Sequence, residues 1–134
     1  MNFKSKLEEK VYSAIKTKES LLVGYTVEKE KLWKDLFSNH KKGREAVDFY
    51  FKEIKVILEV NGKQHYEPTS FTSEDIALDN YERQLKRDKK LKDYCKQEKI
   101  DLVSISYKTI NELDIDSLST YISKRIINAM LGEE

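Results

Sequence analysis

The chain has 134 residues, which is enough for one domain with its own hydrophobic core. Charged residues make up 37% of it, yet the net charge is only +1, so any basic surface that binds a polyanion has to be local. Cys95 is the only cysteine, which excludes an internal disulfide and a cysteine-based zinc site. The N-terminal segment resembles neither a signal peptide nor a membrane span. We therefore expect a single cytoplasmic domain, residues 1–134, without membrane contact.

The first third of the chain predicts a helix, a strand, a second helix and a basic loop. Apolar residues recur at helical spacing over residues 3–17, and the short apolar run over residues 21–27 is typical of a strand. Apolar residues at roughly helical intervals indicate a short second helix within residues 27–40. The basic loop over residues 40–45 follows it.

The rest of the chain predicts an α/β fold. Two strands, a long helix, another strand and a final helix are expected over residues 46–51, 54–60, 74–98, 101–107 and 116–131. Lys52 and Glu53 alone would join the first two strands in a tight hairpin, and Ser73 would cap the long helix. This order of elements predicts a central mixed β-sheet flanked by helices.

Two acidic residues stand within apolar strands. Asp48 lies in AVDFYF and Glu59 in VILEV, and the tight hairpin would place Asp48 opposite Ile57 with Glu59 diagonally beside it. Either acid alone is more simply an edge-strand residue that faces water. Two neighbouring carboxylates repel each other unless a proton or a cation lies between them. The pair therefore favours a site for Mg²⁺ or Mn²⁺.

Two further acids lie on predicted helices. Asp88 falls in the middle of the apolar face of the long helix, either as a site residue or as the i,i+4 partner of Lys92. Spacing alone does not separate these two interpretations. Glu8 borders the apolar stripe of the first helix, and with Glu9 beside it an ordinary solvated acid is the simpler interpretation.

The chain has two histidines. His40 lies in the polar loop and is expected to be solvated. His65 follows the strand of Glu59 by a few residues, and a neutral imidazole there can deprotonate a water, protonate a leaving oxygen or bind a metal. A loop histidine is usually an ordinary surface residue, but beside three acids it is a candidate base.

Basic residues cluster in two segments that suit a polyanion such as DNA. Residues 83–96 contain seven basic and two acidic side chains, and a second cluster precedes Asp48. Such residues neutralise phosphates without reading sequence, although a lysine-rich helix face is also typical of simple solvation. The candidate DNA-binding residues are Lys41, Lys42, Arg44, Lys63, Lys86, Arg87, Lys89 and Lys90.

The segments DFYF, KVILEVNGKQHY, LKRDKKLKDYC and IDLVSISY resemble the PD-(D/E)XK nuclease superfamily. The chain is most similar to the branch with a five-residue EDxHD site, which includes very-short-patch repair endonucleases and nuclease domains of phage homing endonucleases. SKLEEKVY resembles the opening helix of that branch. The resemblance covers about residues 5–107 and implies a restriction-endonuclease-like core.

By motif, the resemblance implies a catalytic set of four acids and one histidine. These residues are Glu8, Asp48, Glu59, His65 and Asp88. Asp48, with Glu59 or the carbonyl of Val60, would hold Mg²⁺ or Mn²⁺, and His65 would activate the attacking water. The lysine of the superfamily, expected two residues after Glu59, is Asn61 here, and the EDxHD branch uses the histidine in its place. Residues 28–42 have no counterpart in the pattern.

The resemblance therefore implies a Mg²⁺-dependent DNA endonuclease of phage or mobile-element origin, acting in the host cytoplasm if phage-encoded. Two alternatives remain open. A nuclease fold without activity, which binds DNA or a partner protein, is consistent with the near-neutral charge and the missing lysine. A structure-selective junction resolvase that acts as a homodimer would differ only in its substrate.

Overall fold

The computed structural model describes residues 3–18, 20–63 and 74–133. Its helices are α1 (Lys6–Ile15), α2 (Trp33–Leu36), α3 (Glu74–Glu98), α4 (Tyr107–Glu112) and α5 (Ile115–Met130). Its strands are β1 (Val27–Leu32), β2 (Ala46–Phe51), β3 (Val56–Asn61) and β4 (Asp101–Ser106). They form one sheet in the order β1-β2-β3-β4, antiparallel except for the parallel pair β3 and β4. The predicted α/β fold with a mixed sheet and flanking helices is confirmed.

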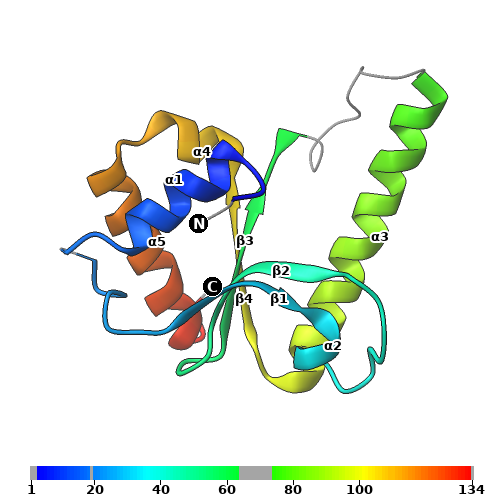
Figure 1. Cartoon of the computed structure of the whole chain (residues 1–134), viewed down its shortest axis with the longest axis horizontal. Helices are drawn as coiled ribbons and strands as arrows, with labels where there is room; N and C mark the ends of the chain where they lie inside the picture. Colours follow the sequence, from blue (N-terminus) through cyan, green and yellow to red (C-terminus); the bar gives the residue numbers. More distant parts are fainter. Residues whose placement is uncertain (1–2, 19, 64–73, 134) are drawn as a thin grey trace.

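Helices cover both faces of the sheet (Figure 1). α1, α4 and α5 pack on one face around a core that includes Phe49, Leu58 and Ile105. α2 and the C-terminal half of α3 pack on the other face, around Trp33 and Ile57. The N-terminal half of α3 rises away from the sheet beside the strand ends (Figure 1). Among the described residues, no helix is both long and apolar enough to cross a membrane.

The predicted strand over residues 21–27 is wrong, because the first strand begins at Val27 and has the sequence VEKEKL. Leu22 of the apolar run is buried in the core and Tyr25 and Val27 are partly buried against it, whereas Leu21 and Val23 are exposed. The charged residues of β1 are half-buried instead, and Lys29 lies 4.4 Å above the ring of Phe3. Side chains that snorkel in this way let an edge strand form without an apolar sequence. The second helix is shorter than expected, and α4 was not predicted.

The predicted two-residue hairpin is also wrong. Residues 52–55 form the loop, Lys55 adopts a φ of 53°, and Tyr50 rather than Asp48 pairs with Ile57. Because side chains alternate between faces, a shift of two residues keeps every side chain on its expected face. The register therefore brings Asp48 level with Glu59. The predicted cap Ser73 lies outside the described residues.

Candidate functional site

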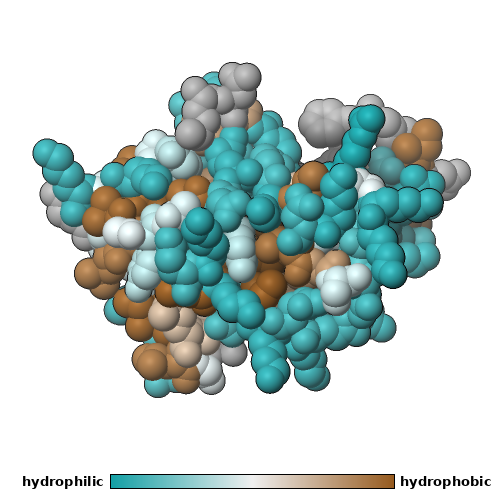
Figure 2. All heavy atoms as spheres, turned by 60° about the horizontal axis from the view of Figure 1, so that its bottom comes forward, coloured by the Kyte–Doolittle hydropathy of each residue, from teal (hydrophilic) through white to brown (hydrophobic). Residues whose placement is uncertain are grey.

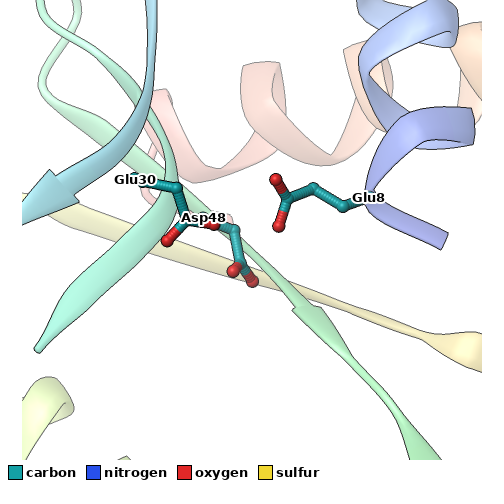
Figure 3. Close-up of side chains that lie close together, drawn as sticks. All are labelled: Glu8, Glu30 and Asp48. Atoms are coloured by element: carbon teal, nitrogen blue, oxygen red, sulfur yellow. The ribbon is translucent and has the colours of Figure 1, made fainter. Parts of the chain in front are cut away.

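Three carboxylates from three different elements converge in the structure (Figure 3). Glu8 comes from α1, Glu30 from β1 and Asp48 from β2, and one oxygen of each lies within 4.8 Å of the others. Glu8 and Asp48 are 1% and 5% exposed, and Glu30 is half-buried. Glu8 and Asp48 are residues that the sequence predicts for the site. Glu30 is one that it misses.

Local structure explains how these three residues meet. The Ser5 side chain caps α1 by accepting a hydrogen bond from the Glu8 amide over 3.1 Å, which fixes the first turn of the helix. Glu30 falls opposite Asp48 in the antiparallel register of β1 and β2. Glu30 also has a φ of 53°, in the left-handed region that residues with a Cβ rarely adopt. A backbone outlier at this position marks a site where the surrounding structure holds strain.

Asp48 and Glu59 replace part of the hydrogen-bond ladder between β2 and β3. Regular pairing of the two strands reaches Phe49 and Leu58 and then stops. Beyond this pair, the Asp48 amide donates to Glu59 Oε2 over 2.8 Å, and the Val60 amide donates to Asp48 Oδ2 over 2.7 Å. The two carboxylates are therefore held by backbone donors of the opposite strand, which fixes their positions before any ligand binds.

Two lysines partly neutralise the three-carboxylate cluster of Glu8, Glu30 and Asp48. Lys4 Nζ lies 3.0 Å from Asp48 Oδ1 and 3.9 Å from Glu30 Oε1, and Lys29 Nζ lies 3.3 Å from Glu8 Oε1. Burial of Glu30 raises the pKa of its carboxyl, against the opposing charge of Lys4. Two ammonium groups against three carboxylates leave one negative charge without compensation when all three acids are ionised.

The cluster also contains buried oxygens without a hydrogen bond. Within the described part of the chain, neither oxygen of Glu8 has a hydrogen-bond partner, and the Lys29 contact to Oε1 is an ion pair only. Glu30 Oε1 is likewise without one. Buried carboxylate oxygens are costly unless a donor or a cation meets them. The excess negative charge and the unsatisfied carboxylate oxygens suit a hard divalent cation such as Mg²⁺ or Mn²⁺, which prefers oxygen ligands.

Glu59 lies beside the cluster and is held from the opposite face of the sheet. Arg87 Nη1 on α3 donates to Glu59 Oε1 over 3.2 Å, and Arg87 Nη2 donates to the Ala46 carbonyl over 3.0 Å. The guanidinium lies 4.9 Å from the centre of the buried Trp33 ring. Burial and the charge of Asp48 raise the pKa of Glu59 to about 8, although Arg87 opposes this shift. Burial and the Asp48 carboxylate therefore favour the protonated form of Glu59, whereas the Arg87 guanidinium favours its ionised form.

A pocket of about 600 Å³ opens onto these groups. Its lining combines the acids with cationic and polar residues, namely Lys4, Ser5, Leu7, Glu8, Asp48, Glu59, Val60, Gly62, Lys63, Gln84, Arg87 and Tyr107. Asp88 lines a smaller neighbouring pocket of about 180 Å³, which shares Glu59 with the first. Asp88 Oδ1 accepts a hydrogen bond from Gln84 over 2.8 Å. The structure thus brings Glu8, Asp48 and Glu59 together and places Asp88 in a neighbouring pocket that shares Glu59, while His65 lies outside the described residues.

The predicted DNA-binding residues fall into two groups. Arg87 is half-buried and engaged by Glu59 and Ala46, so its position is that of a residue that orients the site. The others are exposed, namely Lys41, Lys42, Arg44, Lys63, Lys86, Lys89 and Lys90. Hydrophilic residues dominate the right half of the face in Figure 2, which is the side on which α3 lies in Figure 1. These exposed residues remain candidates for phosphate contacts.

The basic loop over residues 40–45 is anchored by a buried histidine, His40. His40 is 8% exposed, so its expected solvation is wrong. His40 Nε2 lies 3.2 Å from Glu45 Oε2, His40 Nδ1 lies 3.3 Å from the Tyr94 hydroxyl, and the imidazole packs edge-on against Trp33. The two ends of the loop are therefore joined to each other and fastened to α3.

Comparisons with protein-family models, curated proteins and solved structures find no significant match to this chain.

Proposed function

We propose that the protein is a metal-dependent DNA endonuclease that hydrolyses phosphodiester bonds on a restriction-endonuclease-like core. The observation that carries this proposal is the cluster of Glu8, Glu30 and Asp48, which has unsatisfied carboxylate oxygens and whose Glu8 and Asp48 line a pocket together with cationic side chains. A metal-dependent nuclease needs a divalent cation beside a surface that accepts a polyanion. The fold and the cluster supply a candidate for each requirement.

Glu8, Glu30 and Asp48 would hold a Mg²⁺ or Mn²⁺ ion. A bound ion of this kind polarises a phosphoryl oxygen and makes a coordinated water more acidic. Asp48 is fixed for this role by the amide of Val60, whose carbonyl is a further candidate ligand on the same pocket. Glu59 would lie beside the ion without being one of its ligands. Its two oxygens already accept hydrogen bonds from the Asp48 amide and from Arg87.

The remaining residues of the site would bind and orient the substrate. Lys63 lines the pocket and is exposed, so its ammonium can contact a phosphate next to the scissile bond. The exposed lysines of α3 and the basic residues of the loop over residues 41–44 would contact phosphates of the DNA backbone further from the scissile bond. His65 remains the proposed base for the attacking water, and Asp88 would act from the neighbouring pocket that shares Glu59.

A binding module without catalytic activity is the second candidate function. It is favoured by the Lys4 ammonium, which already neutralises Asp48 without a metal ion. A structure-selective junction resolvase would use the same site on a different substrate. The cleavage assay described next distinguishes it from a general endonuclease and from a binding module.

Purified protein should be incubated with supercoiled plasmid, a four-way junction and single-stranded DNA, in Mg²⁺ or Mn²⁺ and with a chelator. We expect metal-dependent cleavage that Asp48→Ala and His65→Ala abolish, while the folded state survives by circular dichroism. Glu8→Ala should also be inactive, and Glu9→Ala, which changes the exposed neighbour on the same helix, should keep full activity. Cleavage of the junction alone would identify a resolvase, and binding to all three substrates without cleavage would identify the module.

A further inference from the structure

Lys4 differs from every other cation near the carboxylate cluster. It precedes the cap of α1, and its side chain reaches from there to Asp48, with Nζ 3.0 Å from Oδ1. The side chain is nevertheless 62% exposed and lines the open pocket. Lys4 Nζ also lies 3.9 Å from Glu30 Oε1, so its ammonium contacts two of the three carboxylates.

Lys29 is the other ammonium at the cluster, and it is held far more firmly. Its side chain is only 16% exposed, Nζ lies 3.3 Å from Glu8 Oε1, and the same atom lies 4.4 Å from the centre of the Phe3 ring. Lys29 also belongs to β1, whose backbone is paired with β2. Of these two cations, Lys4 is the one whose long side chain can turn into solvent without disturbing a strand.

We propose that Lys4 is an intramolecular counter-ion that occupies the open side of the cluster and is displaced when a divalent cation binds. This inference rests on the proposed function, because it concerns the same metal site. An ammonium bound to Asp48 Oδ1 and a metal ion bound to that oxygen compete for the same lone pairs. Lys4 thus sets how tightly the cluster of Glu8, Glu30 and Asp48 binds its ion.

The energetics make this exchange feasible. An ion pair with a largely exposed lysine is worth little, since water and rotamer entropy offset most of the attraction. A divalent ion gains contacts with three carboxylates at once and removes the repulsion among them. Lys4 therefore stabilises the metal-free cluster at a small cost in metal affinity.

The test measures Mn²⁺ binding by titration calorimetry and by the Mn²⁺-induced rise in melting temperature. It compares the wild-type protein with Lys4→Met, Lys4→Arg and Lys6→Met, the last of which removes one exposed charge from the first turn of α1. Lys4→Met should bind Mn²⁺ about two- to fivefold more tightly and show a larger rise in melting temperature, because an exposed ion pair contributes up to about that factor. Lys4→Arg and Lys6→Met should stay close to the wild type.

Each other outcome has a definite meaning. Equal or weaker Mn²⁺ binding by Lys4→Met, with binding by the wild type intact, would overturn the counter-ion role and leave the metal site standing. An equal gain in Lys6→Met would reduce the effect to general charge and overturn it as well. Absence of Mn²⁺ binding in all four proteins would overturn both the metal site and the role of Lys4. Tighter Mn²⁺ binding by Lys4→Met, in a protein that cleaves no DNA, would support the counter-ion role of Lys4 and contradict the proposed nuclease activity.

Discussion

Arg87 on α3 donates a hydrogen bond to Glu59 on β3 over 3.2 Å, and this contact ties the long helix to the strand that carries the site. Arg87 also donates to the Ala46 carbonyl at the start of β2 and packs over Trp33. One guanidinium therefore fixes both strands at the point where their regular pairing ends. The position of Glu59, and through it that of Asp48, depends on a residue on the opposite face of the sheet.

Replacing Arg87 by alanine should destabilise the protein. The change leaves the buried Glu59 without its charged donor and removes the guanidinium from the face of Trp33. Loss of one partner from a buried charged hydrogen bond costs on the order of 2 kcal/mol. Urea denaturation should detect this loss, and Lys89→Ala, an exposed lysine on the same helix, should change stability little. Equal stability of both variants would mean that Arg87 does not hold Glu59.

The pKa of Glu59 predicts a stability that falls as pH rises. Its folded value is about 8 and its ordinary value is 4.5, so between these limits the folded state keeps a proton that the unfolded state has lost. Raising the pH through this window therefore favours unfolding, by up to about 1.4 kcal/mol per pH unit for a single proton. Denaturation at a series of pH values, without divalent ions, should show this slope in the wild type and a flatter one in Glu59→Gln. Parallel profiles would contradict the raised pKa.

The long helix could be predicted because its apolar residues recur at helical spacing, and the two central strands because each is a short, nearly continuous apolar run. Residues 74–98 repeat at helical spacing, and residues 46–51 form a buried run with a single acid, Asp48. Asp48 and Glu59 were found because an acid in an apolar strand is conspicuous, whereas Glu8 was assigned only through the resemblance of SKLEEKVY to the opening helix of the EDxHD branch. Their convergence at one pocket agrees with that interpretation.

Glu30 could not be found in the same way. Its strand, VEKEKL, reads as a polar segment, because the chain buries the stems of charged residues there in place of apolar side chains. Only the pairing of β1 with β2 brings Glu30 opposite Asp48, and no local pattern encodes that pairing. The four-residue loop over residues 52–55 was missed for a related reason, since Lys55 adopts a positive φ without a glycine to signal it.

The left-handed backbone of Glu30 gives a prediction that separates strain from charge. Glu30→Ala and Glu30→Gly both remove the carboxylate, so both should weaken Mn²⁺ binding. Only glycine relieves the φ of 53°, and a left-handed residue with a Cβ costs roughly 1–2 kcal/mol. Glycine loses roughly 0.5–1 kcal/mol more entropy than alanine on folding, so the glycine variant should be the more stable of the two by a net of about 0.5–1 kcal/mol in urea denaturation. An alanine variant as stable as the glycine variant would rule out strain at this position.

The basic loop depends in the same way on Gly43, which has a φ of 117°. A Cβ at this position would collide with the Glu45 carboxylate, which has to move, so Gly43→Ala should separate the ion pair between Glu45 and His40 that joins the ends of the loop. We expect Gly43→Ala to lower the melting temperature and to weaken DNA binding by fluorescence anisotropy, most clearly at low salt, because displaced loop residues no longer meet phosphates. Gly24→Ala is the matched control, since no atom lies within 4 Å of a Cβ there and neither property should change. Weaker DNA binding in both variants would show that the loop has no particular role, and unchanged binding in Gly43→Ala despite a lower melting temperature would confine the role of Gly43 to the fold.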